Sequence, residues 1–171
     1  MPDAHVDLDD DLYGQRKAPL LVREFICFRL GTEWYGLPVH AVREVVLYTG
    51  LTPLPSLPPF ILGIFNLRGN IVSITDLRPV LGLPASPITV SKDSRLIVVE
   101  TDKMETALYV NEVTQVVSFA EDVLEPPLAT IAAGAENALE FVSRFKENWA
   151  ALMNAEKLFE MLIINKGESK R

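Results

Sequence analysis

Few side chains in this sequence have the type and the spacing that catalysis or metal binding requires. His5 and His40 are far apart, and neither has neighbours at the spacing of metal ligands. The one cysteine, Cys27, lies inside the apolar run 25–28 with no histidine beside it, so we interpret it as a small core residue rather than a nucleophile. The sequence therefore predicts no catalytic residue, no metal site and no cofactor.

The remaining groups that could act on a substrate are better explained as structure. Glu121, Asp122 and Glu125 form a loose acidic turn, which a solvated loop explains better than acid–base catalysis. Gly63 and Gly69 flank Ile-Phe-Asn-Leu-Arg, which does not match a phosphate-binding loop. The sequence therefore favours a non-enzymatic protein, and an enzyme is the weakest of the alternatives.

One pair of charged residues is placed so that it can fix two segments against each other. Arg68-Gly69-Asn70 predicts a tight turn between the strands Ile64–Leu67 and Ile71–Thr75. An arginine between two apolar strands favours a carboxylate partner, and Glu44 in an upstream apolar run offers one for a bidentate pair. The alternative is a solvated arginine at a hairpin, which contributes little to stability.

The strands that must position this pair belong to a sequence that repeats itself. Two halves align without gaps at an offset of 71 residues and share identical apolar residues: Ile26 with Ile97, Leu37 with Leu108, Val39 with Val110, Val42 with Val113, Val45 with Val116, and Val46 with Val117. Later the offset becomes 78, where Asp76 meets Asn154, and both residue types favour the N-cap of a following short helix. The change of offset places an insertion in the second half near 128–140.

Short strands with frequent turns, repeated once, predict an all-β fold of two tandem five-stranded SH3-like barrels with short helices. The alternative is one continuous β-sandwich with a coincidental pattern. We place the first subdomain at about 23–90 and the second at about 91–165, and strands can cross between them. Modules of this size have a limited core, so we expect the halves to share buried surface.

Composition narrows the class of partner. The chain has 171 residues, 49% of them hydrophobic, and a formal net charge of −7, which argues against a nucleic-acid-binding role. Residues 1–22 predict a disordered acidic tail and 166–171 a frayed end. A solubilising role explains the acidic tail better than an interaction element. No apolar run is long enough to span a membrane and no secretory signal is visible, so we expect a cytoplasmic protein without direct membrane insertion.

Four motifs together resemble a known family. They are Trp34-Tyr35-Gly36-Leu37 with Val42-x-Glu44-Val45, then Gly63-Ile64-x-Asn66-Leu67-Arg68-Gly69-x-Ile71-Val72, then Asp76-Leu77-Arg78. In this combination the sequence resembles the CheW-like family of chemotaxis coupling proteins, from about Glu24 to Leu162. The resemblance implies two SH3-like barrels, which the repeat predicts independently.

The resemblance also implies a function and a set of site residues. It implies a cytoplasmic, non-enzymatic adaptor that joins the cytoplasmic tip of a chemoreceptor to the regulatory domain of a CheA-type histidine kinase, at membrane-associated receptor arrays. The implied receptor-binding groove lies between the barrels and is lined by Val39, Val42, Glu44, Val113 and Val116. The implied kinase-facing surface comprises Gly63, Asn66, Leu67 and Arg68. Glu44 and Arg68 would form a structural ion pair that holds the shape of the groove.

The sequence departs from the usual family pattern at several positions. Asn111 replaces a residue that is often charged, and Ser73 follows Val72 where proline is common. These departures favour a divergent member that serves a gliding, pilus or other chemosensory-type pathway rather than flagellar swimming. Two other hypotheses stay open: a scaffold that competes with a standard coupling protein, and an SH3-like nucleic-acid-associated factor.

Overall fold

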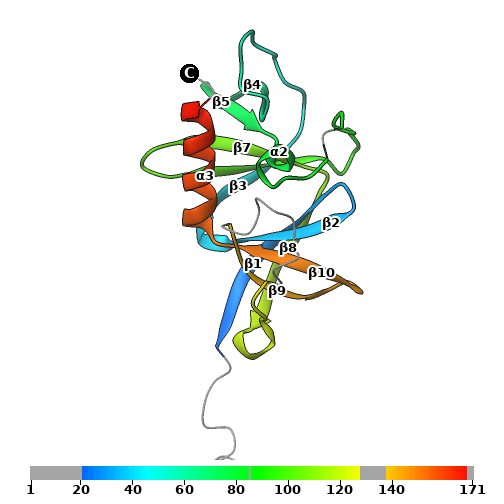
Figure 1. Cartoon of the computed structure of the whole chain (residues 1–171). Helices are drawn as coiled ribbons and strands as arrows, with labels where there is room; N and C mark the ends of the chain where they lie inside the picture. Colours follow the sequence, from blue (N-terminus) through cyan, green and yellow to red (C-terminus); the bar gives the residue numbers. More distant parts are fainter. Residues whose placement is uncertain (1–20, 85, 128–137, 169–171) are drawn as a thin grey trace, which may run out of the picture.

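The computed structural model describes residues 21–84, 86–127 and 138–168 (Figure 1). These residues form strands and a few short helices, with the following bounds: β1 Val22–Leu30, β2 Glu33–Pro38, η1 Val39–Ala41, β3 Val42–Leu47, β4 Ile61–Leu67, β5 Asn70–Thr75, α2 Leu77–Val80, β6 Arg95–Glu100, β7 Glu105–Val110, β8 Glu112–Ala120, η2 Glu121–Val123, β9 Leu139–Phe145, β10 Asn148–Met153 and α3 Ala155–Glu168. The elements η1 and η2 are single 3-10 turns. Most of the range predicted for the insertion, 128–137, and most of the acidic tail lie outside the described residues.

The strands form two five-stranded sheets. Sheet A has the order β8-β1-β2-β10-β9, and sheet B has the order β3-β6-β7-β5-β4. Sheet B lies above sheet A in Figure 1, with α3 alongside sheet B. The predicted all-β fold with two five-stranded units is confirmed. Each sheet combines two adjacent strands from one half of the repeat with three strands from the other half, so the halves 23–90 and 91–165 exchange strands.

The two offsets found in the sequence recur in the strand pairing. Ile26 pairs with Leu37 in sheet A, and the residues 71 positions later, Ile97 and Leu108, pair in sheet B. The parallel pairing of β2 with β10 in sheet A also has an equivalent in sheet B, where β7 pairs in parallel with β5. The repeat therefore reports a real internal duplication, in which every strand of one sheet has an equivalent in the other.

One isolated bridge joins the two edges of each sheet. In sheet B, Thr52 follows the edge strand β3 and pairs with Ile64 of the other edge strand, β4. In sheet A, Glu125 follows β8 and pairs with Val142 of β9. The chain that leaves one edge strand therefore returns to the opposite edge, which satisfies edge groups that would otherwise be open to other strands.

The two sheets share one hydrophobic core. Its buried side chains include Phe28 and Leu37 from sheet A, Ile97 and Leu108 from sheet B, and Leu158 from α3. Each sheet also has a smaller apolar cluster of its own. Because the largest cluster takes residues from both sheets, neither half can bury its apolar surface without the other, as the size of each module predicts.

The helices α2 and α3 begin next to the two polar residues that the repeat aligns, and α3, with 14 residues, is longer than the short helix predicted after Asn154. The Asp76 carboxylate accepts a hydrogen bond from the Arg78 backbone N–H at 3.0 Å at the start of α2. The Asn154 side-chain oxygen accepts one from the Lys157 N–H at 3.0 Å at the start of α3. Both side chains satisfy an amide that the first helical turn leaves unpaired, so the predicted capping role is confirmed.

Candidate functional site

The Arg68 guanidinium and the Glu44 carboxylate form a bidentate ion pair. Nη1 of Arg68 lies 2.8 Å from Oε1 of Glu44, and Nη2 lies 2.6 Å from Oε2. Glu44 is on β3 and Arg68 follows β4, which are the two edge strands of sheet B. The pair therefore joins the two edges of that sheet, beside the backbone bridge between Thr52 and Ile64.

The backbone conformation of the turn at Arg68 fixes the position from which its side chain extends. Arg68 and Gly69 both have positive φ, 51° and 90°, and Leu67 pairs with Asn70 across them. Two residues with positive φ form the type of turn whose twist suits a two-residue hairpin. The Asn66 side-chain oxygen accepts a hydrogen bond from the Gly69 N–H at 2.7 Å, which braces the turn.

The electrostatics of the pair favour a positioning role over a large effect on stability. The Arg68 side chain is 69% exposed and that of Glu44 is 20% exposed, so water screens the attraction. The hydrogen bonds from Arg68 hold the pKa of Glu44 below its usual value. A lowered folded-state pKa means that the stabilisation is present at neutral pH and is lost only as the pH falls through that lowered pKa.

The residues predicted to line a groove lie along repeat-related segments. Val42 of β3 and Val113 of β8 are half-buried and pack against the shared core from the two sheets. Val39 in η1 is also half-buried, and Val116 is exposed. The structure thus places the two equivalent valines, Val42 and Val113, against one common cluster.

Sequence reasoning missed two exposed apolar residues on the same edge strand. Val45 and Leu47 of β3 point away from the half-buried face that carries Val42 and Glu44. In an edge strand with one buried face, apolar residues alternate with polar ones. The successive apolar residues of β3 therefore indicated apolar side chains on both of its faces. Here β3 is apolar on both faces, which is typical of a strand that meets a partner.

The four residues predicted to face a kinase do not share one environment. Asn66 and Arg68 are exposed, whereas Gly63 and Leu67 are buried. A Cβ atom built at Gly63 would lie 2.6 Å from the Thr52 carbonyl oxygen, so only glycine fits at this approach. Gly63 and Leu67 therefore shape the surface from beneath.

A surface pocket lies beside the exposed part of this turn. It has a volume of about 380 Å³ and is lined by Thr49–Thr52 and Ile64–Asn66. The segment 49–52 is the one that closes sheet B through the Thr52 bridge. The pocket, the bridge and the ion pair therefore all lie where β3 and the segment after it meet β4 and its turn. The sequence alone did not indicate the pocket.

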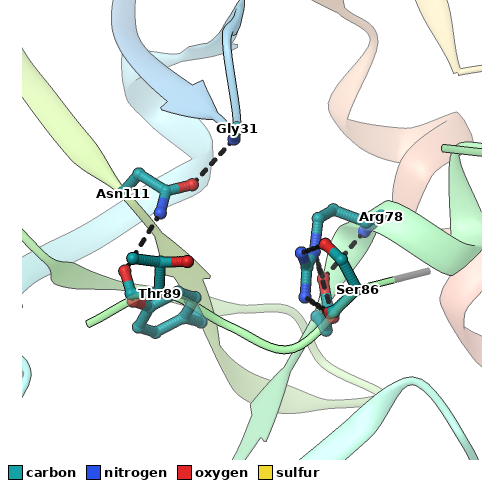
Figure 2. A network of polar contacts seen from close by, with 7 residues as sticks. Gly31, Arg78, Ser86, Thr89 and Asn111 are labelled. Carbon is teal, nitrogen blue, oxygen red and sulfur yellow. Dashed lines mark hydrogen bonds and ion pairs between the residues drawn. The ribbon is translucent and has the colours of Figure 1, made fainter. Parts of the chain in front are cut away.

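Two polar residues hold the long connection between α2 and β6. Figure 2 shows Arg78 against Ser86, where its guanidinium donates to the Ser86 hydroxyl and carbonyl at 2.9 and 2.8 Å. Asn111 accepts a hydrogen bond from the Gly31 N–H at 2.8 Å and donates to the Thr89 carbonyl at 3.4 Å. An aspartate at position 111 could accept but not donate, so the departure from the family pattern has a structural use here.

Cys27 is buried in the apolar cluster of sheet A, and burial raises the pKa of its thiol to about 12. Since the thiolate is the reactive form, the raised pKa leaves very little reactive thiolate near neutral pH. We expect a disulfide reagent to label the folded protein very slowly and the urea-unfolded protein at the rate of an ordinary cysteine. Fast labelling of the folded protein would contradict the core assignment.

Other observations limit what the described residues can do. Within residues 21–84, 86–127 and 138–168, no group of three or more His, Cys, Asp or Glu side chains could hold a metal ion. None of the helices in this part of the chain is long and apolar enough to cross a membrane. The fold and the site together define an all-β protein of two repeat-related units, with a charged pair at the edge of one of them.

Comparisons with known proteins identify the family. The CheW-like domain model matches residues 24–162. The scaffolding protein TtCheW from Thermoanaerobacter tengcongensis superposes with a TM-score of 0.68 at 33% identity, covering 84% of this chain and 90% of that one. Chemotaxis protein CheW of Treponema pallidum is 28% identical over 152 residues, 84% of this chain and 88% of the relative. Protein FrzA of Myxococcus xanthus is 34% identical over 140 residues, 81% and 86% of the two chains.

The chain belongs to the CheW-like domain family. The resemblance found in the sequence is therefore confirmed, and the protein is a scaffolding adaptor rather than an enzyme.

Proposed function

We propose that this protein couples a chemoreceptor to a CheA-type histidine kinase. In this proposal one face binds the cytoplasmic tip of the receptor, another binds the regulatory domain of the kinase, and the protein reaches membrane-associated receptor arrays through these partners. The observation that carries the proposal is the bidentate Glu44–Arg68 pair, which joins the edges of sheet B between the predicted receptor-binding and kinase-facing residues.

The receptor tip would bind along the repeat-related valines. Val39, Val42, Val113 and the exposed Val116 offer apolar contacts, and Glu44 lies at the border of this surface. Apolar anchors in a groove are the usual means by which a helical segment is bound. The negative net charge of the chain would favour a tip with basic residues near its apolar anchors.

The kinase domain would bind at the turn that follows β4. Asn66 and Arg68 supply the exposed polar contacts, while Gly63 and Leu67 hold the backbone beneath them. The pocket lined by Thr49–Thr52 and Ile64–Asn66 offers a recess for a side chain of the partner.

The substitution Arg68→Ala tests this proposal. Without the guanidinium, Glu44 is freed and the turn loses its link to β3, so we expect affinity for the kinase regulatory domain to fall at least about tenfold. The pair is exposed, and the protein should stay folded. Isothermal titration calorimetry with the purified domain measures the affinity, and circular dichroism monitors the fold.

Arg43→Ala is the matched control. Arg43 is the neighbour of Glu44 on β3 and forms its own exposed ion pairs with Glu100 and Glu105. Since the Arg43 side chain belongs to the other face of the strand, its loss should leave the affinity unchanged. If the Arg68→Ala variant binds the kinase regulatory domain as tightly as the wild-type protein does, Arg68 is only a solvated turn residue. Failure of the wild-type protein to bind either a kinase domain or a receptor tip would overturn the coupling function.

A further inference from the structure

A surface pocket lies between the two edge strands of sheet A, and the proposed coupling function does not use it. The pocket has a volume of about 530 Å³. Its walls include Ser118 and Ala120 of β8, Arg144 of β9 and Trp149 of β10. Because β8 and β9 are the outer strands of sheet A, the pocket is an opening where this sheet does not close on itself. We call it the sheet A pocket.

The β8 wall of the sheet A pocket is an open strand edge. The Glu121 N–H donates to the Leu21 carbonyl at 2.8 Å, so these two residues form a hydrogen-bonded pair beside the end of β8. Ser118 and Ala120 occupy the alternate positions of the same antiparallel ladder, where the N–H and C=O groups point away from the neighbouring strand. In the described part of the chain, neither residue forms a backbone hydrogen bond on that outer side. Both residues therefore offer unpaired backbone groups to a further strand.

Sheet A also lacks the ion pair that joins the two edge strands of sheet B. In sheet B, Glu44 and Arg68 connect these strands. By the offsets of 71 and 78 residues, the equivalent positions in sheet A are Gln115 and Lys146. The Lys146 ammonium instead lies 4.8 Å from the centroid of the Trp34 ring, and it forms no ion pair with any described residue. No charged pair of this kind therefore restricts the opening between β8 and β9.

The rim of the sheet A pocket carries more negative than positive charge. Asp122 and Glu125 line the pocket and Glu121 adjoins them, and none of the three carboxylates forms an ion pair with a described residue. The cation among the lining residues is Arg144, whose guanidinium lies 5.0 Å from the centroid of the Trp149 ring. Three carboxylates against one guanidinium favour an occupant with positive charge.

The sheet A pocket also presents apolar surface to solvent. Trp149 is 48% exposed and Val123 is 53% exposed, and both line the pocket. Burial of a half-exposed tryptophan removes a large apolar area from water, and exposed apolar surface in a recess is typical of an interaction site. The occupant is therefore expected to carry apolar side chains as well as positive charge.

We propose that the sheet A pocket binds an extended, basic segment of a partner protein. The backbone of this segment pairs with Ser118 and Ala120 and adds a strand to the edge of β8. Because side chains alternate along a strand, the segment places an apolar side chain against Trp149 and a basic one beside Asp122 and Glu125. A helix or a small molecule would leave the edge of β8 unpaired, so the open edge selects an extended chain. The proposal does not depend on the coupling function.

Titration of the full-length, ¹⁵N-labelled protein with a synthetic peptide tests the proposal. The probe is a short peptide of alternating lysine and valine with blocked ends. We expect the NMR signals of the Ser118 and Ala120 amides to shift on binding, because these groups gain hydrogen-bond partners. The same peptide with methylated backbone amides, and a peptide of alternating glutamate and valine, should each bind at least about tenfold more weakly.

Substitutions in the sheet A pocket separate this contact from a general effect of charge. Trp149→Ala, and Asp122→Asn combined with Glu125→Gln, should each weaken the binding of the lysine–valine peptide at least about fivefold. Glu156→Gln combined with Glu160→Gln, at two exposed positions on α3, changes the net charge by the same amount and should leave the affinity unchanged. Circular dichroism checks that each variant is folded.

Three results would overturn the proposal. The first is equal affinity for the methylated and unmethylated peptides, which would exclude strand pairing. The second is equal affinity of the wild-type protein and the pocket variants for the lysine–valine peptide. The third is a shift of the Ser118 and Ala120 amide signals with protein concentration in the absence of peptide, which would assign the sheet A pocket to a second copy of the chain.

Discussion

Replacement of Asp76 by alanine is expected to lower the free energy of unfolding by about 3–5 kcal/mol, the usual loss when one partner of a buried ion pair is removed. The side chains of Asp76 and Arg78 are 8% and 14% exposed and lie 2.8 Å apart. Alanine leaves the Arg78 guanidinium without a counter-charge and leaves the first turn of α2 without its cap. Urea unfolding followed by circular dichroism measures the change.

Asp76→Asn separates the two contributions. Asparagine is as good an N-cap as aspartate, so it keeps the bond to the Arg78 N–H and loses only the charge. We expect its stability to lie between those of the wild-type and Asp76→Ala. A loss below about 1 kcal/mol in the alanine variant, the scale of an exposed pair, would mean that water replaces the carboxylate and that the pair does not hold the connection between α2 and β6.

The second large effect is expected from Gly63→Ala. The new Cβ would meet the Thr52 carbonyl oxygen at 2.6 Å, and backbone cannot move aside as a side-chain end can. Thr52 and Ile64 exchange two hydrogen bonds, of 2.8 and 2.9 Å, across this approach. The segment that closes sheet B must therefore shift, at a cost of about 1–3 kcal/mol for overpacking. Kinase-domain affinity should fall with it, because the shift reaches the pocket beside Asn66.

Gly36→Ala is the control for Gly63→Ala. Its Cβ would also approach within 2.6 Å of a neighbour, but that neighbour is the Cδ2 atom of Leu152, the end of a side chain. Gly36 lies in the interior of sheet A, away from the pocket beside Asn66. The Gly36 variant can lose stability, yet the binding of the kinase domain should stay unchanged. Isothermal titration calorimetry measures the affinity of both variants for the kinase domain. Equal affinities in the two variants would contradict the proposed role of the segment 49–52 in binding that domain.

Local patterns in the sequence were sufficient for several features. Asp76 and Asn154 precede short helices because their side chains suit the unpaired amides of a first turn. Arg68-Gly69 forms the turn because glycine tolerates positive φ. The offsets of 71 and 78 residues indicated the duplication, since equivalent strands conserve the same alternation of apolar residues.

The candidate site was predictable only in part. The pairing of Glu44 with Arg68 follows from residue types and the turn, and the structure brings the two side chains together. The burial of Gly63 and Leu67 did not follow, because alternation along β4 does not say which face meets the core. The exposed Val45 and Leu47 of β3 were missed for a related reason. A strand that is apolar on both faces has the sequence pattern of an interior strand, so exposure of one face was not expected.

The sequence by itself determined the all-β class, the duplication, the turn at Arg68 and the family. Each of these features depends on residue types and on their spacing along the chain. Only the tertiary structure decided which strands pair. The hairpins β1-β2 and β6-β7 each join the sheet of the other half, where β1 pairs with β8 and β6 pairs with β3. This exchange accompanies the shared core and the two pockets at the sheet edges. The physical reason is that strand partners are chosen by contacts between residues far apart in the chain, and alternation within one strand does not encode them.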